Sequence, residues 1–126
     1  MSNPKKQAVG YTAGAPYAKA VIYGDLVFVS GAVGRNPATG EMAKGDITAQ
    51  TKQTLENVRS TLQAAGSDMD KVVKATVFIT DMSLFKTLNA TYITFFPGEA
   101  PARSCVQVGA LPDPDALVEI EVVAGR

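Results

Sequence analysis

Histidine is absent from this 126-residue sequence, and cysteine occurs only once, at Cys105. Without imidazole there is no Ser-His-Asp or Cys-His relay, and the common zinc sites are excluded because they need histidine or several thiolates. A single cysteine cannot form an internal disulfide, which fits a reducing compartment such as the cytoplasm. Any catalysis must therefore come from carboxylates, Arg, Lys, Tyr, one thiol, backbone dipoles or a cofactor.

An excess of charge, a long apolar run and a nucleotide-binding motif are also missing. Twelve basic residues balance twelve acidic ones, so no basic field attracts nucleic acid or an anionic membrane. No stretch approaches the roughly 20 apolar residues of a membrane helix, and the polar N-terminus is followed by no apolar signal segment. There is no G-x-G-x-x-G or P-loop pattern. We expect a cytoplasmic protein whose partners are neither nucleic acid nor membrane.

The length and the composition predict one soluble domain over residues 1–126. The apolar fraction is 46% and the charged fraction 19%, which are ordinary values for a globular protein. Residues 1–16 carry Gly, Ala and Pro without a period and are predicted to form a docking arm or a loop. Two β-rich runs, 20–23 and 26–29, flank Gly24-Asp25, which suits a type II′ hairpin turn. A turn follows at 36–40, with a short strand near Glu41-Met42.

The hydrophobic period changes to that of a helix after Asp46. One apolar stripe repeats every three or four residues and consists of Ile47, Thr51, Leu55, Val58, Leu62 and Ala65. Asp46 is placed to cap the first turn of this helix, and Gly66 to end it in the left-handed conformation.

The second half of the chain predicts a strand over residues 72–80, then a helix, then two more strands. Asp81 is expected to cap the helix, and Pro97-Gly98 to end it. Its inner stripe is formed by Phe85, Leu88, Tyr92 and Phe95. The last strands, 102–108 and 117–123, are expected to form a tight antiparallel hairpin. The order ββ, α, β, α, ββ predicts an α+β fold with two helices on one face of a mixed sheet.

The last two strands carry the polar residues that are hardest to explain by packing. Arg103, Cys105 and Gln107 share one face of their strand, while Glu119 and Glu121 alternate with an apolar row in the other. In a hairpin, the arginine would lie within reach of a glutamate. One interpretation is a solvent-exposed ion pair across the strands. The other is a pocket in which the guanidinium binds a carboxylate and a glutamate moves protons.

Each further candidate residue also has a structural interpretation. Cys105 lacks a histidine partner and suits a packing residue better than a nucleophile. Tyr17 after Pro16 fits a packing contact or the wall of a pocket. Asn89, about one turn before Tyr92, fits a structural clamp or a ligand contact. Ser30-Gly31 either ends a strand or lets a ligand approach the backbone.

Several segments together resemble the reactive intermediate deaminase (Rid) family, in the family's order and over nearly the whole chain. They are Pro101-Ala102-Arg103-Ser104-Cys105-Val106, Val118-Glu119-Ile120-Glu121, Asn89-Ala90-Thr91-Tyr92 with Phe95-Phe96, Lys74-Ala75-Thr76-Val77-Phe78, Ser30-Gly31 and Pro16-Tyr17. The resemblance implies a chorismate-mutase-like fold and a homotrimer with its sites at the subunit interfaces. It also implies hydrolysis of 2-imino or 2-enamino acids to 2-keto acids and ammonia, without cofactor or metal.

The resemblance assigns roles to individual residues. Arg103 would hold the substrate carboxylate, and Glu119 would place and activate the water. The remaining binding residues implied are Tyr17, Ser30, Gly31, Asn89 and Cys105. A carboxylate among apolar strand residues should have a raised pKa, which suits this task.

The sequence also departs from the family pattern around the expected site. Ala32 replaces a common Gln, Ala18-Lys19 replaces a more polar pair, and Gly34-Arg35 a more apolar one. These departures affect the expected substrate preference rather than Arg103 or Glu119. Two alternatives stay open: a non-catalytic protein that binds 2-keto acids or similar carboxylates, and an endoribonuclease or translation inhibitor. The lack of histidine and the balanced charge argue against an ordinary acid-base nuclease.

Overall fold

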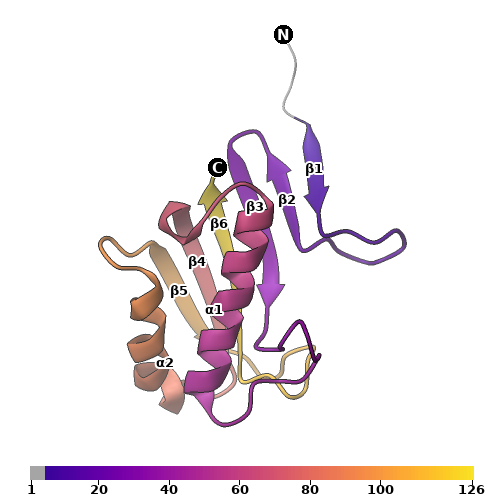
Figure 1. The fold of residues 1–126 in the computed structure, drawn as a ribbon. Helices are drawn as coiled ribbons and strands as arrows, with labels where there is room; N and C mark the ends of the chain where they lie inside the picture. Colours follow the sequence, from indigo (N-terminus) through magenta and orange to yellow (C-terminus); the bar gives the residue numbers. More distant parts are fainter. Residues whose placement is uncertain (1–4) are drawn as a thin grey trace.

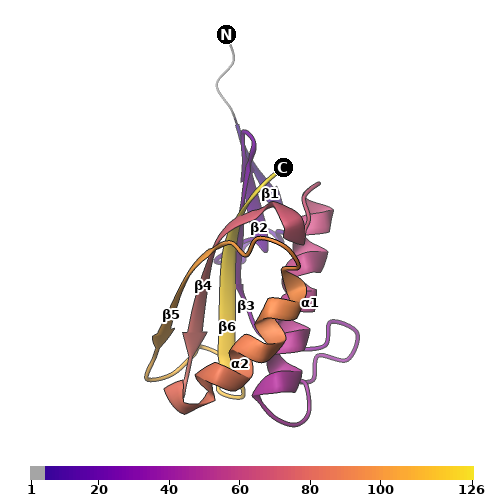
Figure 2. The ribbon, with the colours of Figure 1, turned by 90° about the vertical axis from the view of Figure 1, so that its left-hand side faces the viewer.

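The computed structural model describes residues 5–126, so residues 1–4 of the predicted N-terminal arm lie outside the described part. The chain forms one six-stranded sheet in the order β1-β2-β3-β6-β4-β5 (Figure 1). Both helices cover the same face of this sheet, which leaves the opposite face bare (Figure 2). The α+β prediction, with a mixed sheet and helices on one face, is confirmed.

The first three strands form an antiparallel meander. They are β1 (Lys6–Val9), β2 (Ala20–Tyr23) and β3 (Leu26–Ala32). The hairpin between β2 and β3 has a positive φ of 61° at Gly24 and none at Asp25, as the predicted type II′ turn requires.

Strand β1 corrects the prediction that residues 1–16 form only an arm or a loop. Of its four residues only Val9 is half-buried, and the other three are exposed. An edge strand held by backbone hydrogen bonds buries little, so it leaves no hydrophobic alternation in the sequence. The predicted short strand near Glu41 is reduced to a single bridge between Arg35 and Met42.

The long helix α1 (Ile47–Ala64) is confirmed, including its cap. The Asp46 carboxylate accepts hydrogen bonds from the backbone N–H groups of Thr48 and Ala49. Gly66 follows the helix with a φ of 81°. The buried side of α1 packs on the sheet and contributes Leu55, Val58 and Leu62 to the core. A short 3₁₀ turn (Met69–Lys71) then leads into β4 (Val72–Ile79).

The second helical segment is predicted as one helix but consists of three consecutive pieces. Asp81 caps a 3₁₀ turn (Met82–Leu84), which continues directly into α2 (Phe85–Tyr92) and ends in another 3₁₀ turn (Ile93–Phe95). Leu88, Tyr92 and the following aromatic pair are buried against the rest of the core.

The predicted hairpin of the last two strands is wrong. β5 (Ala102–Gln107) pairs in parallel with β4, and β6 (Val118–Gly125) lies between β3 and β4. β4, α2 and β5 form a strand-helix-strand unit, and a helical crossover of this kind joins parallel neighbours. The unbroken apolar row of β6 suits a central strand, whereas β5 buries no residue fully and is the edge of the sheet.

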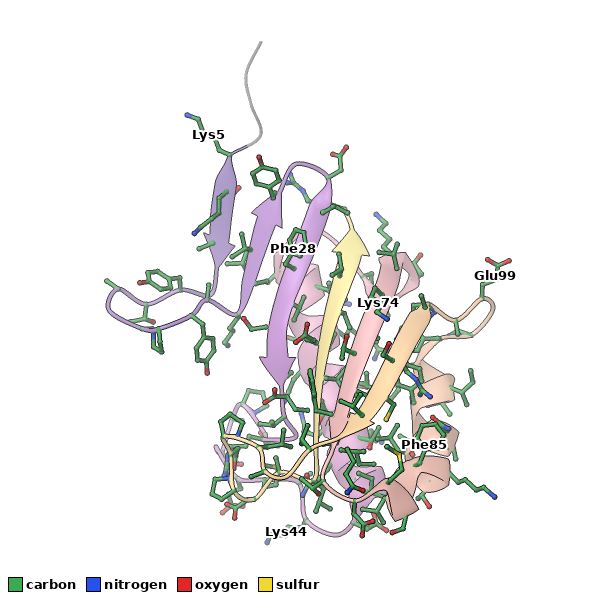
Figure 3. All side chains as sticks on the ribbon, turned by 180° about the vertical axis from the view of Figure 1, so that it is seen from behind. Lys5, Phe28, Lys44, Lys74, Phe85 and Glu99 are labelled. Atoms are coloured by element: carbon green, nitrogen blue, oxygen red, sulfur yellow. The ribbon has the colours of Figure 1, made fainter. Side chains whose placement is uncertain are left out.

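The bare face of the sheet is rich in apolar side chains. Figure 3 shows this face, with Phe28 on β3 and Lys74 on β4. Phe28 is 44% exposed and Leu26 41%, and Tyr23 and Val106 are exposed to a similar degree. Within residues 5–126, no helix combines the length and the apolar character needed to cross a membrane.

Candidate active site

Arg103 lies on the edge strand β5 and points toward the helix layer. Its register partner on β4 is Ala75, which is fully buried beneath the helices. Its Nη1 donates a hydrogen bond of 2.7 Å to Oδ1 of Asn89 on α2. Its guanidinium carbon lies 4.7 Å from the ring centre of Tyr92 and 5.4 Å from that of Phe85. Three side chains of helix α2 therefore contact the Arg103 guanidinium.

No carboxylate pairs with Arg103 among residues 5–126. The ion pairs of this part of the chain are formed by Arg35 and Arg59 instead. The cross-strand ion pair with Glu119 is therefore not formed within the chain. A guanidinium carries five N–H donors, and the only one of them with a partner in the described part is the bond to Asn89. The unused donors and the unneutralised charge suit the capture of an external carboxylate.

Cys105 lies two residues further along β5, on the same face as Arg103. It pairs in register with the buried Val77 and is itself half-buried. Burial raises the pKa of its thiol, although the nearby Arg103 charge acts in the opposite direction. At neutral pH the side chain is a thiol rather than a thiolate, so it does not have the character of a nucleophile.

Glu119 lies on the other face of the sheet. It pairs in register with Phe78 on the bare face, and its carboxylate lies over Gly31 of β3. A Cβ atom at Gly31 would lie 2.5 Å from Oε2 of Glu119, so the carboxylate keeps this position only beside a glycine. Burial raises the pKa of Glu119, and the neighbouring charge of Glu121 raises it further. This direction agrees with the expectation for a carboxylate among apolar strand residues.

Ser30 and Gly31 form a β-bulge next to Glu119. The register passes from the Val29–Val122 pair to the Ala32–Ile120 pair, so β3 places two residues opposite one. Bulges of this kind redirect side chains and are frequent beside active sites. The Ser30 hydroxyl donates a hydrogen bond of 2.6 Å to the carbonyl oxygen of Ala18.

A cavity of about 270 Å³ opens beside this bulge. Among its lining residues are Tyr17, Ser30, Gly31 and Ala32. Tyr17 is 66% exposed and stands at its rim rather than in the core. Lys19 and Arg35 also line the cavity, so three of the departures from the family pattern, Lys19, Ala32 and Arg35, lie on its wall. Helix α1 contributes Asn57, Ser60 and Thr61, and Glu119 is not among the lining residues.

The predicted site residues thus fall into two groups that the single chain keeps apart. The edge group contains Arg103, Asn89 and Cys105, and the bulge group contains Glu119, Gly31, Ser30 and Tyr17. β5 and β6 are separated by β4, which corresponds to about 10 Å between their axes. Arg103 and Glu119 also lie on opposite faces of the sheet. One chain alone cannot bring Arg103 and Glu119 to the same small substrate.

Two features of the surroundings were not predicted. The sequence predicts Phe85 and Tyr92 only as core residues of the helix, but both rings contact Arg103. Their spacing with Asn89 along one side of α2 is the signal that indicates a shared contact. Arg35 binds Asp113 through two hydrogen bonds, of 2.6 and 2.9 Å, and this pairing lowers the pKa of Asp113. It ties the turn after β3 to the loop before β6, and one sequence gives no signal for a pair of residues so far apart.

Metal ligation finds no support in the described residues. Between residues 5 and 126, no group of three or more His, Cys, Asp and Glu side chains is close enough together to hold an ion. The expectation of a cofactor-free and metal-free reaction stays a prediction.

Comparison with known proteins gives consistent matches over almost the whole chain. The family model described as Endoribonuclease L-PSP matches residues 7–125. A 2-iminobutanoate/2-iminopropanoate deaminase of Escherichia coli is 44% identical over 114 residues, which cover 88% of each chain. Among solved structures, E. coli TdcF with bound serine superposes with a TM-score of 0.84 at 38% identity, covering 100% of this chain and 99% of that one. Yeast Mmf1 has a TM-score of 0.90 at 32% identity, covering 97% and 99%.

Proposed function

The chain belongs to the endoribonuclease L-PSP family, also called the Rid family, and from that premise we propose that it hydrolyses 2-imino and 2-enamino acids to 2-keto acids and ammonia. The name of the E. coli relative supports this reaction class. The observation that carries the proposal is Arg103, a planar cation held in place by α2 and left without an acidic partner in residues 5–126. Such a group is suited to two-point binding of a carboxylate.

A complete site requires a second subunit, and we propose a homotrimer with a chorismate-mutase-like arrangement. Arg103 and Glu119 of one chain lie on opposite faces of the sheet, and in the proposed assembly Arg103 of one subunit meets Glu119 of its neighbour. The bare sheet face supports assembly because its exposed apolar side chains, such as Phe28, would be buried between subunits. Sedimentation velocity should give a trimer, and a monomer at micromolar concentration would contradict the interface site.

In the proposed reaction, Arg103 holds the substrate carboxylate and Glu119 of the partner subunit acts on water. Glu119 takes a proton from water as its oxygen forms a bond to the imine carbon. The proton is returned to the nitrogen, which gives a carbinolamine with a hydroxyl and an amino group on the same carbon. Glu119 then takes the remaining proton from the hydroxyl and passes it to the nitrogen as the carbon–nitrogen bond breaks, so the hydroxyl oxygen becomes the carbonyl of the 2-keto acid and ammonia leaves. An enamine first gains a proton at carbon to become the imine. A raised pKa helps Glu119 both to accept and to return the proton.

The other predicted residues complete the proposed site. Asn89 holds Arg103, Gly31 gives Glu119 its space, and Ser30 and Tyr17 line the cavity on the bulge side. Cys105 would contribute chiefly through its backbone. We place this single domain of residues 1–126 in the cytoplasm, where amino acid metabolism generates imines.

Binding without turnover is the second candidate, since a relative was solved with bound serine. The unused donors of Arg103 would hold a 2-keto acid or an amino acid equally well. In that case the protein would be a sensor or a regulator of a partner. RNA cleavage has no comparable support among the described residues.

The experiment that separates these functions generates imines in the assay itself. An L-amino acid oxidase supplies 2-imino acids from alanine, 2-aminobutanoate, leucine and glutamate, and their decay is followed with and without the protein. Catalytic amounts should accelerate decay with stoichiometric release of ammonia. Binding alone would protect at most one equivalent of imine and would overturn the proposed hydrolysis. An unstructured RNA incubated in parallel should stay intact.

A further inference from the structure

Helix α2 presents a single line of three side chains to Arg103. Phe85, Asn89 and Tyr92 follow one another at intervals of four and three residues, so they lie on the same side of the helix in successive turns. We call them the α2 stripe. Each of the three contacts the guanidinium, Asn89 by a hydrogen bond and the two aromatic residues through their rings.

We propose that Phe85 and Tyr92 are positioning residues, whose rings fix the plane of the Arg103 guanidinium so that its free N–H groups meet a carboxylate in one orientation. This inference rests on the proposed role of Arg103 as the carboxylate anchor. An arginine without such contacts rotates freely, and binding must then stop that motion at a cost in entropy. Rings that hold the cation beforehand remove part of this cost and align the substrate for attack.

The state of Tyr92 indicates that its ring, rather than its hydroxyl, matters. Tyr92 is only 4% exposed, and its hydroxyl is buried without a hydrogen-bond partner in the described structure. A buried unpaired hydroxyl is unfavourable, so it gives no structural reason for tyrosine here. The ring itself is held by Phe96, at a centroid distance of 4.8 Å and a tilt of 43°.

A second arginine in the same helix layer shows what is special about Arg103. Arg59 lies over the ring of Phe95, 5.1 Å from its centre, but it is also paired with Glu56 at 3.0 Å. Its charge already has an internal partner. Arg103 contacts two rings and no carboxylate, so its aromatic contacts hold a charge that is still available to a ligand. Phe95 therefore provides a matched control for Tyr92.

The test compares Tyr92→Leu, Phe85→Leu and Phe95→Leu in the full-length protein. Loss of a partly desolvated cation–π contact corresponds to about a tenfold change in an equilibrium constant. Tyr92→Leu should raise KM for the imine, and the Kd for 2-oxobutanoate measured by calorimetry, by about tenfold with a smaller change in kcat. Phe85→Leu should raise KM and Kd by less, because Phe85 is only half-buried and its ring lies further from the guanidinium than that of Tyr92. Phe95→Leu should lower thermal stability without changing KM.

Two further measurements keep the result independent of folding and of turnover. Tyr92→Phe, which keeps the ring, should restore KM and Kd to within about twofold of the natural protein. NMR of the ligand-free protein should show slow rotation of the Arg103 guanidinium, which Tyr92→Leu accelerates and Phe95→Leu does not.

Failure of this inference is distinguishable from failure of the proposed function. If Arg103→Lys weakens ligand binding but Tyr92→Leu does not, the positioning role is wrong and the anchor stands. If the natural protein hydrolyses no imine, the proposed function is wrong, while the NMR comparison and the Kd for 2-oxobutanoate still decide the role of the rings. Equal effects of Tyr92→Leu and Phe95→Leu on Kd would mean that both residues act only through core packing and that Tyr92 does not position Arg103.

Discussion

The edge of the sheet around Arg103 and the bulge around Glu119 have opposite effects on the charged group that each contains: the first leaves the charge in place and the second disfavours it. Arg103 is surrounded by rings and an amide that fix it without neutralising it. Glu119 is surrounded by partly buried strand residues and a like charge, both of which raise the pKa of its carboxyl. The first environment favours binding of an anion, and the second favours exchange of a proton. Under the proposed function neither region is sufficient by itself, since the edge would bind the substrate without chemistry and the bulge would supply chemistry without an anchor.

The largest expected effect is that of Arg103→Lys, which keeps the charge and removes the planar fork. Losing a charge-assisted hydrogen bond costs about 1.5–3 kcal/mol, and a misplaced imine carbon adds to this loss. We expect kcat/KM for imine hydrolysis to fall by about a hundredfold or more, with folding and assembly retained. Arg59→Lys is the matched control, because Arg59 also stacks on an aromatic ring but has its own carboxylate. A folded Arg103→Lys protein with near-normal kcat/KM would refute two-point capture.

A smaller effect is expected on the bulge side from Gly31→Ala. The added Cβ would lie 2.5 Å from Oε2 of Glu119, and the flexible carboxylate can move away without unfolding the chain. The Glu119 carboxylate would then be misplaced, so kcat should fall by about tenfold to a hundredfold. This loss is smaller than the full contribution of a general acid–base group, because a displaced carboxylate can still act in part. Gly109→Ala is the control, since a Cβ there meets no atom within 4 Å. Unchanged kcat in Gly31→Ala would mean that the position of Glu119 is unimportant.

The smallest effect concerns Glu121, whose negative charge raises the pKa of Glu119. Glu119 must be ionised to activate water, so kcat/KM should fall as the pH drops through an apparent pKa above the ordinary 4.5. Glu121→Gln should move this acidic limb to lower pH, because it removes a like charge. A limb that does not move in Glu121→Gln would assign the titration to another group.

The same raised pKa of Glu119 affects stability. The folded chain holds the proton at a pH where the unfolded chain has released it. The contribution of Glu119 to the free energy of unfolding therefore decreases as the pH rises from the pKa of the unfolded chain through the pKa of the folded chain. Denaturant titrations across this window should show a smaller decrease in Glu119→Gln.

Helical parts of the fold were predictable because their signals are local. The cap at Asp46, the apolar stripe of α1 and the glycine after it all lie within twenty residues or so of one another. The partner of β5 was not predictable from its own residues, because pairing is decided by contacts distant in sequence. The strand-helix-strand order favours a parallel neighbour for β5, whereas the turn-rich segment 111–115 favours a hairpin with β6, and the structure follows the first signal.

The sequence proposes the site as a set of residues, and it does not give their geometry. The family resemblance implies Arg103, Glu119, Asn89 and Gly31 as site residues, whereas periodicity alone leaves both a surface ion pair and a carboxylate pocket open for the arginine. The false hairpin placed Arg103 and Glu119 side by side, whereas the real topology puts them on opposite faces. The use of Gly31 as space for a carboxylate depends on a bulge, which arises from register and leaves no pattern in one strand.

The central claim is that each site combines Arg103 of one subunit with Glu119 of another, and subunit mixing tests it most directly. Arg103→Ala and Glu119→Gln are each expected to be nearly inactive alone. When the two are co-refolded in equal amounts, half of the arginines and half of the glutamates are intact. About one quarter of the interface sites should then hold both, so about a quarter of the natural activity should return. If mixed trimers form, as shown by native mass spectrometry, and activity stays at the level of the separate variants, the shared site is contradicted.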